Sequence, residues 1–146
     1  MNLLKLETHK ICPMSPEEIA KIAELEDKIL ENIPQEDNQL PVTHTIHGGM
    51  YIRTLHMPQN SVMIGAIIKK PTCLIISGDV LVRTGIETKR YSGYNVLEAQ
   101  CPRKQAFISM SDTWLSMCYA TNSTNLEDIE HEITDEYAKL QTVRFK

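Results

Sequence analysis

Three of the five histidines, His44, His47 and His56, lie close together in the sequence and are the first candidates for metal chemistry. Neutral imidazole nitrogens bind zinc, iron, nickel and copper ions. His44 and His47 are three positions apart, so on one strand they point to opposite faces and need a bend to share an ion. Gly48-Gly49 could supply that bend, or His47 could meet His56 across a hairpin. Surface histidines without a metal are the competing interpretation, and we predict no bound metal and no other cofactor.

Six side chains, His56 again among them, have the chemistry to contact a small ligand: Arg53, His56, Lys69, Arg103, Trp114 and Tyr119. Arg53 is the best single candidate, because it lies between Tyr51 and Leu55 and shares their face of a strand. If that face is buried, the guanidinium needs a carboxylate of the protein or an anionic ligand, since an unpaired buried charge is costly. If the face is exposed, Arg53 is simply solvated. The sequence leaves both alternatives open.

No motif for catalysis is present, so we predict no catalytic residue and do not expect an enzyme. Cys12, Cys73, Cys101 and Cys118 form no CxxC pair and have no zinc-finger spacing. Cys73 and Cys118 lie in apolar segments, and we expect them to be buried free thiols in a reducing cytosol. A disulfide or a metal role is the alternative. A nucleophilic Cys118 would need a base that the sequence does not place beside it, and no GxSxG, Walker or GxGxxG motif occurs.

The charge of the chain is distributed unevenly. Residues 1–42 carry nine acidic and four basic side chains, and residues 122–146 carry six and three. Residues 43–121 carry four acids and eight bases. A general nucleic-acid binder needs a strongly basic face, which argues against that function. The basic middle leaves room for a small anionic ligand, whereas two solvated acidic helices are the simpler explanation of the ends.

Two amphipathic helices are predicted, one near each end. Ser15-Pro16-Glu17-Glu18 has the pattern of a capping box with proline at the first helical position, and apolar residues then recur at helical spacing up to Ile33, before Pro34. Near the other end, Thr124 is a candidate cap, and an apolar stripe runs from Leu126 to Leu140.

Between the helices the hydrophobic period changes to two, which predicts strands. The expected strands are 44–47, 50–57, 61–69, 72–77, 80–84, 94–99, 105–109 and 113–120. Ser77-Gly78-Asp79 is expected to be a tight turn, and so is the segment from Gly85 to Arg90. Many short strands with closely spaced turns are typical of a sandwich or a closed barrel, and not of a parallel sheet with crossover helices.

The segment from Gly49 to Glu130 resembles small cupin-like proteins of tailed phages and bacteria. The similarity lies in an arginine-bearing strand before a proline turn, a strand with a central glycine, a strand leading into a glycine turn, an Asp-Thr-Trp sequence and an acidic tail. These are 51–58, 62–67, 74–80, 112–114 and 125–130. The resemblance implies a mainly β cupin-type double-stranded β-helix, or jelly-roll barrel, and a homodimer.

The departures from the cupin pattern bear on function. Cupins usually place two histidines and a glutamate on neighbouring strands after the first glycine and a further histidine on a later strand, which together hold a metal. Here the first region is Gly65-Ala66-Ile67-Ile68-Lys69-Lys70, which has no histidine and no carboxylate. On the later strand, Cys118 or Tyr119 stands in place of a ligand. The usual metal centre is therefore not encoded.

We expect one barrel at 43–121, an N-terminal helical extension at 1–42 and a C-terminal helix within 122–146 that packs on the same domain. The favoured function is non-catalytic binding of a small anionic molecule in the barrel. The alternatives are a metal-dependent cupin enzyme (an isomerase or dioxygenase) with rearranged ligands, and a structural or protein-interaction domain. The sequence has no apolar run of membrane-spanning length and no signal peptide pattern, so we expect a cytoplasmic protein without a nucleic-acid or membrane partner.

Overall fold

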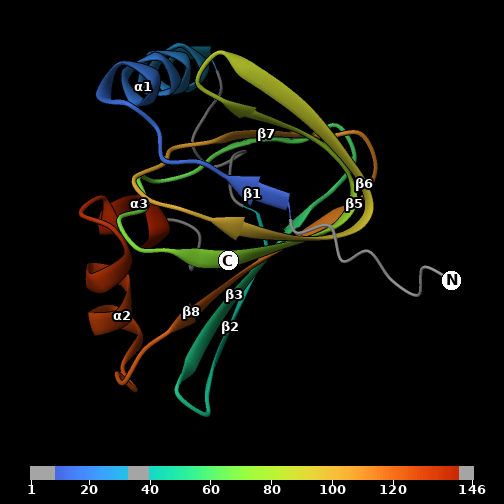
Figure 1. Cartoon of the computed structure of the whole chain (residues 1–146). Coiled ribbons are helices and arrows are strands. Elements are labelled where there is room, and N and C mark those ends of the chain that lie inside the picture. The colour runs from blue at the N-terminus through green and yellow to red at the C-terminus, as the bar shows by residue number, and fades with distance from the viewer. Residues whose placement is uncertain (1–8, 33–39, 142–146) are drawn as a thin grey trace, which may run out of the picture.

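The computed structural model describes residues 9–32 and 40–141 of the chain. Its elements, in chain order, are β1 (His9–Ile11), α1 (Pro16–Asn32), β2 (Val42–His47), β3 (Met50–Met57), β4 (Val62–Ile64), β5 (Thr72–Thr84), β6 (Glu87–Ala99), β7 (Ala106–Ser109), β8 (Thr113–Ala120), α2 (Leu126–Ile133) and α3 (Tyr137–Gln141). The prediction of a mainly β fold with a helix toward each end is confirmed (Figure 1). None of the described helices is long and apolar enough to cross a membrane.

The eight strands form one continuous sheet that folds into two layers, here called the first and the second sheet, and β5 contributes to both. The first sheet has the order β1-β6-β5-β8-β3-β2, and β7 pairs with both β4 and β5 to build the second. Residues 73–77 of β5 pair with β8, whereas residues 80–83 of the same strand pair with β7. The β5–β6 hairpin therefore curves from one sheet into the other (Figure 1). This strand arrangement is that of a jelly-roll barrel.

The change of sheet occurs at a pair of glycines. Gly78 of β5 lies opposite Gly93 of β6, with φ angles of 144° and 79°. A side chain at Gly78 would meet Thr113, because a Cβ atom there would lie 2.5 Å from Thr113 Oγ1 and 2.8 Å from Thr113 Cα. The predicted tight turn at 77–79 is therefore wrong. Glycine in a strand also permits a sharp bend, and the chain continues through Gly78 as one strand.

Other predictions of local structure are confirmed or corrected by the pairing. β3 and β8 have the predicted limits, and the capping box at the start of α1 is present, since Ser15 Oγ accepts from Glu18 N and Glu18 Oε1 accepts from Ser15 N. The N-terminal segment is not only helical, because β1 adds a parallel strand beside β6. The hairpin turn is confined to Gly85 and Ile86. The predicted end of α1 at Pro34 lies outside the described residues.

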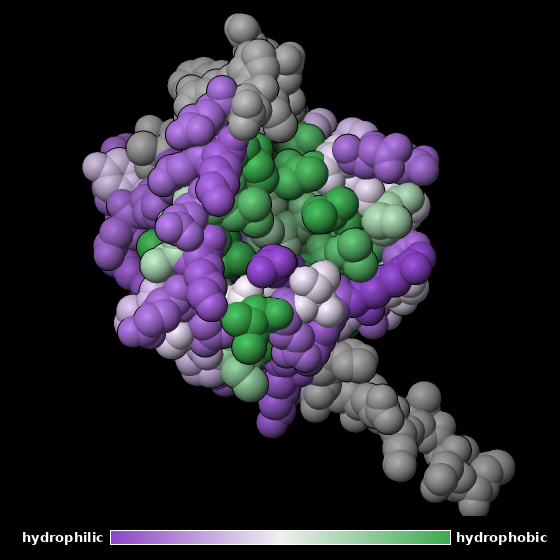
Figure 2. All heavy atoms as spheres, turned by 90° about the horizontal axis from the view of Figure 1, so that it is seen from above, coloured by the Kyte–Doolittle hydropathy of each residue, from purple (hydrophilic) through white to green (hydrophobic). Residues whose placement is uncertain are grey.

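The space between the sheets is filled by side chains. The main core cluster draws on β1 to β3 and β5 to β8; its buried members are Ile11, Val42, Leu55, Met57, Leu74, Ile76, Val80, Val82, Tyr91, Leu97, Ala99, Phe107 and Leu115. Burying each such large apolar side chain stabilises the fold by about 1.5–3 kcal/mol. Seen from above, apolar side chains also gather in the centre of one outer face, with polar ones around them (Figure 2).

A second core cluster attaches α2 to the inner face of β3 and β8, and contains Tyr51, Ile68, Met117, Ile129 and Ile133. Asn125 caps α2, accepting from Glu127 N and Asp128 N, so the predicted cap at Thr124 is one residue too early. The predicted continuous helix is also wrong. It ends at Ile133, because Thr134 is extended with φ −152°, and α3 follows as a separate helix.

A buried ion-pair cluster ties α1 and α3 to the barrel. Lys104 has a fully buried side chain whose Nζ lies 3.2 Å from Glu26 Oε1, 3.2 Å from Glu136 Oε1 and 3.0 Å from Gly65 O. Lys139 Nζ lies 2.5 Å from Glu26 Oε1 and 2.7 Å from Glu136 Oε2. Each carboxylate is thus shared by two ammonium groups, which offsets part of the cost of burying the charge.

Candidate functional site

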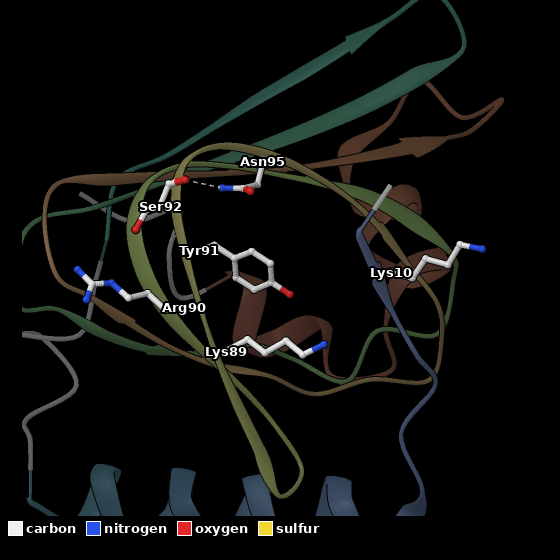
Figure 3. A pocket seen from close by; sticks show the side chains of 6 residues that line it. All are labelled: Lys10, Lys89, Arg90, Tyr91, Ser92 and Asn95. Carbon is white, nitrogen blue, oxygen red and sulfur yellow. Dashed lines mark hydrogen bonds between the residues drawn. The ribbon is translucent and has the colours of Figure 1, made fainter. Parts of the chain in front are cut away.

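Two adjoining hollows lie between the N-terminal segment and the part of the β5–β6 hairpin that leads to its turn. The deeper one, here called the hairpin cavity, has a volume of about 160 Å³ and is lined by residues 10–14, the ends of β5 and β6, Glu18 and Gln105. The outer hollow is wider, at about 360 Å³. Lys10, Lys89 and Tyr91 line both, so a single ligand could occupy them together (Figure 3).

Gln105 supplies a buried amide to the hairpin cavity. The residue is only 5% exposed and lies just before β7. Arg103 Nε donates to Gln105 Oε1 over 3.3 Å, which fixes the orientation of the amide. Gln105 Nε2 is buried and has no hydrogen-bond partner within the described chain. A buried donor left without an acceptor costs about 1–3 kcal/mol, so a ligand oxygen that reached it would be favoured.

Arg103 adds positive charge behind this amide. Its guanidinium is buried, and it donates to Thr72 Oγ1 at 2.6 Å and to Gln100 O at 3.1 Å. Burial lowers the pKa of Arg103 to about 10, with the Cys101 charge acting in the opposite direction. The group is therefore still a cation at neutral pH, and the oxygen acceptors that it reaches are neutral.

The rim of the outer hollow is basic, because Lys10, Lys89 and Arg90 line it, whereas the lining of the hairpin cavity also contains Glu18 and Glu87. In Figure 3 the Tyr91 hydroxyl and the Lys89 ammonium group point to one side of β6 and Arg90 to the other. Arg90 forms a two-bond ion pair with Asp79, with distances of 2.8 and 2.5 Å. Lys89 is only loosely paired, at 3.8 Å from Glu87. Burial raises the pKa of the Tyr91 phenol, so it stays protonated and can donate a hydrogen bond.

Apolar residues form the remaining wall of the hairpin cavity: Ile11, Met14, Val82 and Ile86. The site therefore combines an apolar wall, a buried amide donor and a rim with two lysines. Ligand pockets are generally apolar with a few polar groups that fix the orientation of the ligand. This combination suits a small molecule with an apolar body and one anionic group.

The side chains proposed from the sequence as ligand contacts are dispersed. Arg53 shares the face of buried Tyr51 and Leu55, so that face is the inner one, and Arg53 already takes part in an interaction within the chain. His56 stacks on Trp114 with ring centroids 4.7 Å apart, and Trp114 is 45% exposed on the outer side of the first sheet.

Two others are held by carboxylates of the C-terminal region. Lys69 Nζ lies 2.7 Å from Asp135 Oδ1, and Tyr119 Oη donates to Glu132 Oε2 over 2.7 Å. Burial, with the bond to Glu132, raises the pKa of Tyr119 to about 12. Of the six, Arg103 is the one that contacts a residue of the hairpin cavity, through Gln105.

The three histidines proposed as metal ligands, His44, His47 and His56, do not come together in one site. His44 Nδ1 lies 2.7 Å from the Tyr51 hydroxyl, and His47 is exposed at the end of β2. Across residues 9–32 and 40–141, no three or more His, Cys, Asp or Glu side chains are grouped so that they could hold a metal ion.

The residues that line the site were not identified from the sequence. Lys89 lay in a segment predicted to be a solvated turn, and Lys10 in a segment with no predicted strand. The one available signal was the mixed character of Glu87–Arg90, where charged residues precede an apolar strand. Nothing in the sequence marks Gln105 as buried, because its environment is built by Arg103, β5 and the N-terminal segment.

Comparison with known proteins bears on the fold alone. No protein-family model matches the chain, and no curated protein matches it. Among solved structures, it is similar to an RmlC-like cupin family protein from Methanocaldococcus jannaschii, with a TM-score of 0.48, 14% identity and coverage of 62% of this chain and 87% of that one.

Two further solved structures are similar to this chain to about the same degree. An uncharacterised double-stranded β-helix protein from Klebsiella pneumoniae has a TM-score of 0.48 and 8% identity, with 62% and 90% coverage. A cupin superfamily protein from Desulfitobacterium hafniense has a TM-score of 0.48 and 10% identity, with 58% and 80% coverage. By its own strand order, shared hairpin and core, this chain is a mainly β protein with the cupin-type double-stranded β-helix fold and a helical segment toward each end.

Proposed function

We propose that this protein is a non-catalytic binding protein whose hairpin cavity and outer hollow hold a small molecule with an apolar body and an anionic group. The observation that carries the proposal is the hairpin cavity with Gln105 in its lining, because the buried Nε2 of this residue has no acceptor within the described chain. The basic rim of Lys10 and Lys89 supports an anionic group on the ligand. The apolar wall supports a hydrocarbon or aromatic body.

A matched pair of dyes tests the proposal. 8-Anilinonaphthalene-1-sulfonate has the rings and the anionic group, and N-phenyl-1-naphthylamine has the rings without the sulfonate. We expect the sulfonate dye to bind more tightly, as measured by fluorescence titration. The K10A/K89A variant should weaken its binding by about fivefold, because a charge pair near the surface contributes up to about 1 kcal/mol. Binding of the neutral dye should change little.

Two controls make this test specific. K21A removes an exposed lysine from α1, outside both hollows, and should leave both affinities unchanged. Near-UV circular dichroism must show that each variant keeps its native packing, because loosely packed proteins also bind the sulfonate dye. Equal affinity of the two dyes, or an equal effect of K21A and K10A/K89A, would argue against an anion site.

A second function, self-association, is supported by the outer face of the first sheet. The pairing places Tyr94, Trp114 and His56 in one row across four strands, and the next row contains Val96 and Ile75. Tyr94 is 70% exposed, and Val96 and Trp114 are about half exposed. Apart from His56, the acidic or basic side chains of these rows and the following one are Glu98 of β6 and its register partner Lys10 of β1, which have opposite charges. A face with so little charge can meet a second copy of itself across a two-fold axis without repulsion.

We propose a homodimer formed through the Tyr94–Trp114 end of this face. Sedimentation equilibrium over a range of protein concentrations should give a dimer that W114K converts to monomer, because the lysine charge would be buried at the contact. K69M, which alters an exposed lysine elsewhere, should not change the association. A wild-type chain that remains monomeric at the highest concentration would exclude this interface.

A further inference from the structure

Two cysteines far apart in the sequence lie side by side on the outer face of the first sheet. Cys73 of β5 is directly opposite Cys118 of β8 in the antiparallel register. Cys73 is exposed and Cys118 half-buried, while their neighbours Thr72, Leu74 and Met117 are buried. Both thiols therefore point outward. The expectation that these cysteines are buried is wrong, because alternation along each strand turns them away from the core.

The geometry of such a pair matches that of a disulfide. Residues directly opposite each other in an antiparallel pair have Cα atoms about 4.5–5.5 Å apart. Disulfide-bonded cysteines have Cα atoms about 4.4–6.8 Å apart, so the bond needs no large backbone movement. The two thiols also influence each other: burial raises the pKa of Cys118, and the charge of Cys73 raises it further. All four cysteines are free thiols in the structure.

We propose that Cys73 and Cys118 form a cross-strand dithiol that closes reversibly to a disulfide joining β5 to β8. The reaction partner is a small disulfide of the glutathione type. The Cys73 thiolate attacks one sulfur of the glutathione disulfide, and one glutathione leaves as a thiolate that takes up a proton. The Cys118 thiolate then attacks the Cys73 sulfur and releases the second glutathione. Two protein thiols are oxidised, one small disulfide is reduced to two thiols, and the two protons pass to the released thiolates.

The order of attack follows from exposure and acidity. Cys73 is the more accessible thiol, and the pKa of Cys118 is raised by burial. Attack on an external disulfide requires a thiolate that can be reached, which favours Cys73 as the first nucleophile and Cys118 as the resolving one. This pair is formed by β5 and β8, and neither cysteine lines the hairpin cavity or the outer hollow. The proposal is thus independent of ligand binding there.

The test uses the C12S/C101S variant, which keeps Cys73 and Cys118 as its only cysteines. After incubation with oxidised glutathione and removal of the reagent, we expect the free thiols to fall from two to none. Intact-mass spectrometry should show a loss of two hydrogens and no bound glutathione. Dithiothreitol should restore both thiols. Wild-type protein treated in the same way should fall from four thiols to two, or lower if Cys12 or Cys101 also reacts.

Matched variants distinguish a pair from two independent thiols. C12S/C101S/C73S and C12S/C101S/C118S each retain one cysteine and should accumulate a glutathione adduct, or stay reduced, without losing two hydrogens. Phenylarsine oxide should bind C12S/C101S in a dithiothreitol-sensitive chelate with loss of water and should bind each triple variant far more weakly. Stable glutathione adducts on both cysteines of C12S/C101S, covalent dimers on non-reducing gels, or two thiols that persist after treatment would each overturn the proposal.

Discussion

The K104M variant should have a free energy of unfolding lower than the wild type by about 3 kcal/mol, because removal of one partner from a buried ion pair typically costs about 3–5 kcal/mol. Lys104 has a fully buried side chain and contacts Glu26 and Glu136, which come from α1 and the segment before α3. Methionine keeps the chain length and fills most of the volume. What is lost is the charge, and both carboxylates then depend on Lys139, which is 43% exposed.

Urea unfolding followed by circular dichroism measures this loss. K69M is the matched control, because it removes the same group from an ion pair whose side chains are 41% and 88% exposed. Exposed pairs contribute about 0–1 kcal/mol, so K69M should be close to the wild type. If K69M and K104M lowered the free energy of unfolding equally, the buried ion pairs of Lys104 would stabilise the fold no more than an exposed pair does. E136Q added to K104M should recover part of the loss, because it removes a carboxylate that has lost its cation.

The same ion-pair cluster should make the free energy of unfolding depend on pH in the acidic range. Burial alone would raise the pKa of Glu136, but hydrogen bonds from Lys139 and Ile67 N and the charge of Lys104 lower it more, so the pKa lies below the ordinary glutamate value of 4.5. A lowered pKa contributes stability that is fully present above the ordinary value and is lost as the pH falls through the lower, folded-state value. The E136Q variant should therefore lose less stability than the wild type between neutral pH and about pH 3. A pH profile of E136Q parallel to that of the wild type would contradict this origin.

The G78A variant should lose about 3 kcal/mol or more of unfolding free energy. Its φ of 144° is strained for any side chain, and a Cβ atom would lie 2.7 Å from Asp112 O and 2.8 Å from Thr113 Cα. Both are backbone atoms, so relief requires β5 and β8 to separate where the hairpin changes sheet. Overpacking of this kind costs about 1–3 kcal/mol, and the backbone strain adds to it.

Gly93, opposite Gly78, is the natural control. It also has a positive φ, of 79°, but nothing lies within 4 Å of a Cβ atom built there. G93A should therefore lose only the unfolding free energy that comes from backbone strain at positive φ, about 1–2 kcal/mol. Urea midpoints of the two variants measure the difference. If G93A were as destabilised as G78A, contact with Thr113 would not be the cause.

Local sequence determined those features that depend on neighbouring residues. The capping box of Ser15 and Glu18, the two-residue period of Met50–Met57 and the apolar stripe of α1 are all set within a few positions, and the structure has them where they were predicted. The mainly β fold followed from the same patterns, whereas the cupin-type barrel was expected from the resemblance of residues 49–130 to cupin-like proteins. Errors arose where local signals were ambiguous: a glycine between two apolar runs is typical of a turn, yet Gly78 bends a continuous strand.

Tertiary structure alone decided which side chains meet. Cys73 and Cys118 are far apart in the sequence, and only the β5–β8 register makes them neighbours. Gln105 becomes a buried donor beside Lys89 only because β1, the hairpin and Arg103 come together around it. The sequence by itself therefore determined the elements and their buried faces, since these depend on periodicity and caps. The candidate site depends on contacts between distant segments, and the register and curvature of the sheets set those contacts.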